Sequence, residues 1–291
     1  MTEADCVYVS SRGIMKSCDI YPPNPVSSTR RCYEYDWARM KPGSSVYIIG
    51  SSVPDFLQRA WPLITVPCVL VTGDCDQTMP IDVVTEAQFK ELIESPKLLA
   101  WFSQNLVLQH PKLHPIPIGL DYHTLSEQKQ HPWGPQQTPL NQEQILKAIQ
   151  TREEERIPLA YANFQFSMNT RYAADRQEAL QLLDPSAVVY EPKPVSRFVT
   201  WAHQHRYTHV VSPFGGGLDC HRTWEALALR TIPILHSSPL DPLFEGLPVL
   251  IVQSWSDVTK ERLAIQIPIQ IHPKLTLAYW TNQIRGAQVL A

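Results

Sequence analysis

Short apolar runs alternate with amphipathic stretches along most of the chain. Runs of four to six residues rich in Val and Ile are typical of buried strands, and stretches with apolar residues three or four apart are typical of helices. Strands are expected at residues 7–10, 45–49, 67–72, 116–120, 158–162, 187–190, 208–212, 232–236 and 248–252. Helices are expected at residues 54–61, 86–93, 170–183, 196–203 and 219–230. Buried strands separated by helices indicate parallel βαβ units, so the pattern predicts an α/β fold.

A polar stretch rich in Pro and Gln interrupts this alternation after residue 125. We interpret residues 126–145 as a linker between an N-terminal domain, residues 1–125, and a C-terminal domain, residues 146–274. Two α/β domains joined in this way predict a cleft between them. In open α/β sheets, ligands bind beyond the carboxyl ends of the strands, and the motifs described below fall at such ends.

Composition and charge narrow the function further. The 291 residues carry a net charge of −3, which does not suggest a nucleic-acid partner. No stretch approaches the about 20 apolar residues that a membrane span needs, and the acidic first residues do not resemble a signal peptide. The six cysteines form no CxxC pair, which favours reduced thiols and a cytoplasmic location.

Three of the eleven glycines are consecutive, Gly215, Gly216 and Gly217, between a predicted strand and a predicted helix. Glycine allows close approach of a ligand and positive φ, and the free N–H groups of the following helix can bind an anion. On that helix His221, Arg222 and Glu225 share one face, where Arg222 could bind a diphosphate and Glu225 the hydroxyls of a ribose. A glycine turn capped by Asp219, with Arg222 and Glu225 as a surface pair, remains the alternative.

Two carboxylates, Asp74 and Asp76, directly follow a predicted buried strand. One of them could be the general base that deprotonates an acceptor hydroxyl. Alternatively, Asp-Cys-Asp could hold Mn²⁺ or Mg²⁺ on a nucleotide diphosphate, or the two side chains could cap a turn. Because the anion-binding residues lie in the other half of the chain, we favour Asp74 as the base, with Asp76 as the second candidate and no metal ion.

Other residues at predicted strand ends are candidates for contact with an acceptor. They are Arg12, which follows the first predicted strand, and Asp121, Tyr122 and His123, which follow the fourth. A well-packed strand end would explain these residues equally well.

The segment from Ser212 to Leu227, with Ser-Pro-x-Gly-x-Gly-x-Asp-x-His-Arg-x-Trp-Glu-Ala-Leu followed by Ile-Pro-Ile, resembles the donor-binding core of exostosin-like glycosyltransferases. The resemblance covers residues 208–252 most specifically and continues to Trp255. The N-terminal half is similar to small soluble members encoded by large DNA viruses of algae, including the chlorovirus β-xylosyltransferase type. Some family members carry an N-terminal Golgi membrane anchor, and no such anchor is expected in this chain. We therefore expect a cytoplasmic location, in the host cell if the gene is viral.

The resemblance implies a GT-B fold, with two Rossmann-like domains facing across a cleft and a last helix, within residues 275–291, that packs back on the first domain. It implies an inverting transfer of a sugar, with xylose favoured, from a UDP-sugar to a glycan or glycoprotein. The UDP-sugar is a co-substrate, and no cofactor is required. The expected donor-binding residues are Asn163, Arg171, Ser212, Gly215, Gly216, Gly217, Asp219, His221, Arg222 and Glu225. A nucleotide-sugar-binding module without catalysis is the alternative from a different class.

Overall fold

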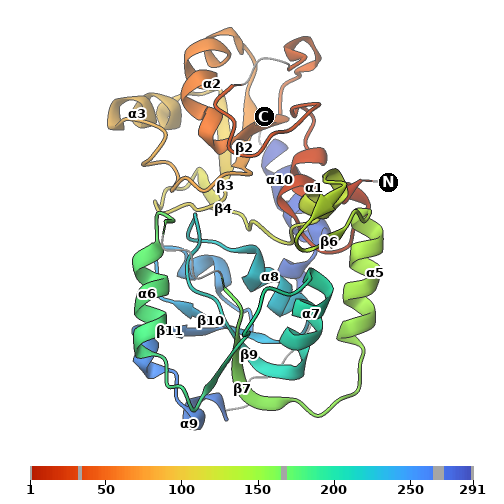
Figure 1. Cartoon of the computed structure of the whole chain (residues 1–291). Coiled ribbons are helices and arrows are strands. Elements are labelled where there is room, and N and C mark those ends of the chain that lie inside the picture. Colours follow the sequence, from red (N-terminus) through yellow and green to blue (C-terminus); the bar gives the residue numbers. More distant parts are fainter. Residues whose placement is uncertain (1, 32–34, 165–168, 265–271, 290–291) are drawn as a thin grey trace.

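The computed structural model describes residues 2–31, 35–164, 169–264 and 272–289. Two α/β units lie one above the other in Figure 1, the first in red to yellow and the second in green to blue. No helix within the described residues is long and apolar enough to cross a membrane. The five cysteines that lie in the described ranges are free thiols, as the sequence suggested.

The first unit is built on a parallel sheet with the strand order β1-β2-β3-β4. These strands are Ser44–Ile49, Cys68–Gly73, Leu98–Ser103 and Leu113–Pro115. Every residue of β1 and β2 is buried, which explains why both are almost continuously apolar. The helices of this unit are α1 (Ser11–Lys16), α2 (Val53–Arg59), α3 (Glu86–Glu94) and α4 (His123–Glu127).

The second unit has a parallel sheet with the order β11-β10-β9-β7-β8. Its strands in chain order are β7 (Ile157–Ala162), β8 (Val188–Tyr190), β9 (Tyr207–Val211), β10 (Ile232–His236) and β11 (Leu250–Val252). Its helices are α6 (Ala173–Leu182), α7 (Arg197–Arg206), α8 (His221–Ala228) and α9 (Lys260–Leu263). Short 3-10 turns occur at Glu3–Asp5, Trp37–Arg39, Gly50–Ser52, Trp61–Leu63, Asp241–Phe244, Trp255–Asp257 and Pro273–Leu275.

Two elements tie the units together. Helix α5 (Pro139–Gln150) follows a small antiparallel hairpin, β5 (Gln130–His131) and β6 (Gly134–Pro135), and lies beside both units (Figure 1). Helix α10 (Leu277–Gln288) returns from the second unit and packs on α1 and the first sheet. The last helix thus lies on the first unit.

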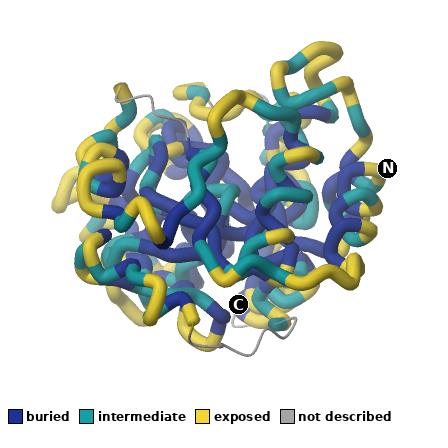
Figure 2. The backbone as a smooth tube through the Cα atoms, turned by 60° about the horizontal axis from the view of Figure 1, so that its bottom comes forward, coloured by how far each residue is buried: buried dark blue, intermediate teal, exposed yellow. Residues whose placement is uncertain are grey.

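A single apolar cluster runs from the first unit into the second. It joins α1 and α10 through Ile14 and Trp280, and it continues to Trp201 of α7 and Trp224 of α8. Figure 2 shows this buried interior in dark blue beneath an exposed outer layer in yellow. The continuity of the cluster stabilises the contact between the two units, because separating them would expose large aromatic side chains to water.

The predicted α/β fold with two Rossmann-like units is confirmed, but several elements differ. Residues 7–10 and 116–120 are not strands; one bridge, between Ser10 and Gly119, joins the two segments. Strands β3 and β4 complete the first sheet, and neither was predicted. Helix α1 was not predicted either. The segment 126–145, interpreted as a linker, contains the β5–β6 hairpin and the first half of α5.

Candidate functional site

A cavity of about 830 Å³ lies between the two units. The first unit contributes Asp76 and Ile118, which follow β2 and β4. The second contributes Asn163, Glu191 and Gly216, which follow β7, β8 and β9. The cavity therefore lies where the carboxyl ends of both parallel sheets meet, which is the position expected for a ligand in an open α/β sheet.

Most residues that the sequence assigned to a donor site meet in this cavity. Its lining includes Asn163, Gly216, Gly217, Asp219, His221, Arg222 and Glu225, together with Asp76 from the opposite side. The other candidates lie outside this lining: Arg171, Ser212, Gly215, Arg12, Asp74, Asp121, Tyr122 and His123. Of these, Ser212 supports the site, because its hydroxyl oxygen accepts a hydrogen bond from Arg222 Nη1 at 3.4 Å.

The glycine run allows close contact between the units. None of its residues has a positive φ, so the conformational freedom expected from the sequence is not used. A Cβ on Gly216 would collide with the Asp76 carboxylate, and a Cβ on Gly217 would lie 2.8 Å from the side-chain nitrogen of Asn105. Side chains of the first unit thus occupy the space that the missing Cβ atoms leave.

Helix α6 fixes the start of the glycine run. The backbone N–H of Phe214 donates to Asp175 Oδ2 at 2.8 Å, and the Phe214 carbonyl accepts from Arg176 Nε at 2.9 Å. Arg176 also lines the cavity, where it adds positive charge near Arg222. Arg176 was not among the donor-binding residues expected from the sequence.

The first two turns of α8 present three polar side chains to the cavity, His221, Arg222 and Glu225. His221 Nδ1 donates to the carbonyl of Gly119 at 2.7 Å, across to the first unit. Burial lowers the pKa of Arg222, but its guanidinium remains protonated and positively charged. Cys220 is the N-cap residue of α8, and its side chain accepts no hydrogen bond from the first N–H groups of the helix.

Asp219 does not cap α8. Its Oδ2 accepts from the backbone N–H of Ile118 in the first unit at 2.7 Å, and Trp224 Nε1 donates to its Oδ1 at 2.9 Å. Burial raises the pKa of this carboxyl to about 6. Asp219 thus joins the two units beneath the cavity, a role that the capping interpretation did not anticipate.

Sequence reasoning missed Arg197, at the start of α7. This buried residue lines the cavity, and its Nη2 lies 3.2 Å from Asp121 Oδ2 while its Nε lies 3.8 Å from Glu225 Oε1. Its guanidinium also stacks 4.3 Å from the ring centre of Trp133. An arginine at the first position of a helix gives no local signal for this role, because its partners lie far away in the sequence.

The candidates at residues 121–123 serve internal contacts. Asp121 accepts hydrogen bonds from the backbone and hydroxyl of Thr124 in addition to its pairing with Arg197. Burial alone would raise its pKa, but His123, His221 and Arg197 hold the pKa of Asp121 far below its ordinary value. Tyr122 is fully buried, and its hydroxyl donates to Glu143. Their contact with an acceptor stays a prediction.

The two aspartates after β2 face different surroundings. Asp76 is exposed and lies against Gly216 in the cavity. Asp74 is buried, has φ 55°, and pairs with Arg12 at 3.5 Å. Burial raises the pKa of Asp74, and the charge of Arg12 opposes that rise. The structure therefore separates two carboxylates that the sequence presented as a pair.

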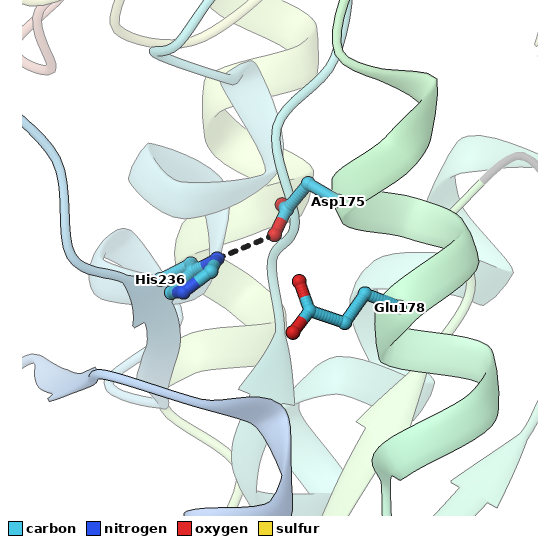
Figure 3. A group of neighbouring side chains, drawn as sticks. All are labelled: Asp175, Glu178 and His236. Carbon is cyan, nitrogen blue, oxygen red and sulfur yellow. Dashed lines mark hydrogen bonds and ion pairs between the residues drawn. The ribbon is translucent and has the colours of Figure 1, made fainter.

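One group of three side chains in the described ranges, Asp175, Glu178 and His236, has the composition of a metal site (Figure 3). Both ring nitrogens of His236 are already engaged, by Asp175 at 2.7 Å and by the carbonyl of Gln253 at 2.9 Å. Asp175 also accepts from Phe214 and Trp255. Because these ligand atoms hold the glycine run and neighbouring turns together, the group is a structural support behind the cavity.

Two Rossmann-like sheets that face each other across a cavity, with the last helix on the first unit, place the chain in the GT-B class of α/β folds. No protein-family model matches the chain, and no curated protein matches its sequence.

Similar solved structures include two UDP-forming α,α-trehalose-phosphate synthases. The one from Burkholderia vietnamiensis is 10% identical, with a TM-score of 0.46 over 88% of this chain and 76% of that chain. The one from Burkholderia xenovorans is 10% identical, with a TM-score of 0.44 over 86% of this chain and 74% of that chain. At this distance neither carries an argument about the chemistry of this chain.

Proposed function

We propose that the chain is a glycosyltransferase that moves a sugar from a UDP-sugar to a hydroxyl of a glycan or glycoprotein. The observation that carries this proposal is the cavity between the two units, which gathers Arg222 and Glu225 on one side and has Asp76 on the other. The preference for xylose rests on the resemblance of the sequence to the viral xylosyltransferase type.

The charges of the cavity suit a nucleotide diphosphate. Arg222 and Arg176 provide positive charge beside the glycine run, where a diphosphate would also meet the first N–H groups of α8. Glu225 is one turn further along α8 and can accept both hydroxyls of a ribose. Asn163 Oδ1 is buried, lines the cavity and has no hydrogen-bond partner among the described residues, which leaves it for a ligand.

The proposed reaction is a single in-line displacement with inversion. The acceptor hydroxyl gives its proton to the Asp74 carboxylate, and its oxygen forms a bond to C1 of the sugar as the bond from C1 to the diphosphate oxygen breaks. The electron pair of that bond leaves with UDP. Arg222 and Arg176 then stabilise the charge that develops on the diphosphate.

We propose that no metal ion takes part. A metal bound by Asp74 and Asp76 would need both carboxylates on one cation, but Asp74 is turned toward Arg12 and Ser27. The arginines of the second unit lie where the leaving diphosphate would need charge compensation. These contacts favour the metal-independent mechanism over the alternative in which the two aspartates bind Mn²⁺ or Mg²⁺.

Replacement of the proposed base tests the mechanism. Asp74→Asn should bind UDP within twofold of the original protein and lose at least about 100-fold in turnover, the usual effect of removing a general base. Transfer by the unaltered protein should survive EDTA. Calorimetry with UDP measures the binding, and transfer assays with UDP-xylose, UDP-glucose and UDP-GlcNAc measure the turnover. Asp55→Asn, on α2 outside the cavity lining, is the control.

Three results would contradict parts of the proposal. Activity that is lost with EDTA and restored by Mn²⁺ would establish the metal-dependent mechanism. An active Asp74→Asn variant together with an inactive Asp76→Asn variant would move the base to Asp76. Tight UDP-sugar binding with neither transfer nor donor hydrolysis, for every sugar tested, would identify a binding module.

A further inference from the structure

Three hydrogen bonds hold Asp74 in place. Its backbone N–H donates to Gln104 Oε1 at 2.8 Å, and its carbonyl accepts from the N–H of Ser28 at 3.0 Å. Its Oδ1 accepts from the hydroxyl of Ser27 at 2.9 Å. A left-handed backbone in a residue other than glycine is uncommon, and such a conformation persists only where its surroundings fix it.

Arg12 provides the remaining contact. This buried residue of α1 places Nε 3.5 Å from Asp74 Oδ2, and its Nη2 donates to the Ser27 hydroxyl at 3.0 Å. Ser27 therefore links the guanidinium to the carboxylate, since it accepts from Arg12 and donates to Asp74. The other terminal nitrogen of Arg12 donates to Glu127, at the end of α4.

The two oxygens of Asp74 differ in a way that suits proton transfer. Oδ1 is committed to Ser27, whereas Oδ2 is buried without a hydrogen bond, and so is the facing Arg12 Nε. A carboxylate oxygen that is close to a positive charge but accepts no hydrogen bond keeps its lone pairs for an incoming proton. The positive charge also compensates for the loss of water around the anion.

We propose that Arg12 is the positioning residue of the catalytic carboxylate, acting with Ser27 to orient Asp74 so that Oδ2 takes the proton of the acceptor hydroxyl. This inference rests on the proposed function, because it assumes that Asp74 is the base. It also changes the role of Arg12, which the sequence suggested as an acceptor contact. All three nitrogens of its guanidinium face Asp74, Ser27 or Glu127, so none is directed at a ligand.

Several other ionisable groups surround Asp74, and each contributes to its electrostatics. They are Glu127 from α4, His221 from α8, Tyr47 from β1 and Cys75 from the turn after β2. Arg12 and His221 favour the ionised form of Asp74, whereas Glu127 opposes it. Loss of Arg12 would leave the negative charge of Glu127 beside Asp74, so the pKa of Asp74 would rise.

The test compares Arg12→Gln, Arg12→Lys and Ser27→Ala with a surface control, Arg262→Gln. We expect Arg12→Gln to lower kcat by about 100-fold, because the base would be misplaced. The KM for the donor should stay within twofold, because neither Arg12 nor Asp74 lines the cavity proposed for the donor. The acidic limb of the pH profile of kcat/KM should move to higher pH. Arg12→Lys should recover part of both changes, and Ser27→Ala should lower kcat by about tenfold.

The possible outcomes separate this inference from the proposed function. If Asp74→Asn is inactive while Arg12→Gln and Ser27→Ala keep the original kcat and acidic limb, the inference is wrong and the base assignment stands. If Asp74→Asn is active, the inference about Arg12 and the assignment of Asp74 as the base are both wrong. If Arg12→Gln does not fold, Ser27→Ala tests the inference, because Ser27 is exposed. A lower kcat of Ser27→Ala with an unchanged KM for the donor supports the inference, and an unchanged kcat overturns it.

Discussion

Glu3 is a buried acid at the start of the chain, with the hydroxyl of Ser10 donating to its Oε2 at 2.6 Å. Burial raises the pKa of Glu3 to about 7. A carboxyl whose pKa is higher in the folded state binds protons more tightly there than in the unfolded chain. Its contribution to stability is therefore complete below about pH 4.5 and is lost as the pH rises through 7.

Replacing this acid with a neutral amide should remove that loss. At pH 8 we expect Glu3→Gln to exceed the original protein in free energy of unfolding by up to about 3 kcal/mol, and at pH 4.5 the two should agree. Urea denaturation at both pH values measures the difference, with the exposed Glu94→Gln as the control. Equal stabilities at pH 8 would show that folding does not raise the pKa of Glu3.

Single residues could be predicted from the sequence where their function depends on local spacing. His221, Arg222 and Glu225 reach the same cavity because one helical turn separates them. Asp219 and Arg12 could not be assigned correctly in this way. Asp219 bonds to Ile118, which is 101 positions away, and Arg12 lies 62 positions from Asp74, so only the folded chain shows which groups satisfy them.

At the scale of elements, the glycine run shows how two units approach each other. Gly216→Ala would push aside the exposed Asp76 side chain, which can move, so stability should change by less than about 1 kcal/mol. The added methyl group would lie beside the proposed diphosphate position, and we expect UDP to bind about tenfold more weakly. Calorimetry with UDP and thermal unfolding measure the two effects.

Gly217→Ala is the matched variant, with the opposite expectation for stability. Its methyl group would meet Asn105, which is buried and hydrogen-bonded to Cys75 and to the N–H of Asp219. Disturbing these bonds should cost about 1–3 kcal/mol of stability. Equal stability losses in the two alanine variants would show that the two glycines are not distinguished by their neighbours.

Most strands were predictable because buried parallel strands are continuously apolar. The errors arose where an apolar run has another use. Residues 116–120 are apolar but follow an irregular path, since Gly119 has φ 66° and lies against the backbone of Val9. Helix α5 was missed because its sequence is rich in Gln and polar, and its buried side contacts both units instead of one sheet.

At the scale of the whole molecule, two further contacts join the units outside the lining of the cavity. The hydroxyls of Thr78 and Tyr172 lie 2.6 Å apart, and the guanidinium of Arg171 forms a two-pronged pair with Asp82. Arg171 was predicted to bind the donor, but in this arrangement its charge is directed to the first unit. Exposed pairs of this kind contribute about 0–1 kcal/mol.

If the pair holds the units closed over the donor, breaking it from either side should have the same effect. We expect Arg171→Gln and Asp82→Asn each to weaken UDP-sugar binding by no more than about fivefold, the equivalent of 1 kcal/mol, and the double variant to weaken it no further. A much larger effect of Arg171→Gln alone would show that Arg171 contacts the diphosphate. Binding titrations on the four proteins complete this cycle.

The contacts around Asp74 also bear on how the donor is protected. A carboxylate that can deprotonate a sugar hydroxyl can also activate water, which would waste the donor by hydrolysis. Ser27 and Ser28, on an exposed segment, bond to Oδ1 and to the backbone carbonyl of Asp74, and Oδ2, which faces Arg12, is buried. In this arrangement solvent therefore does not reach Oδ2. If the carboxylate becomes accessible only when the acceptor enters, it would deprotonate the acceptor hydroxyl and not water. Shielding of the base would then favour transfer over hydrolysis of the donor.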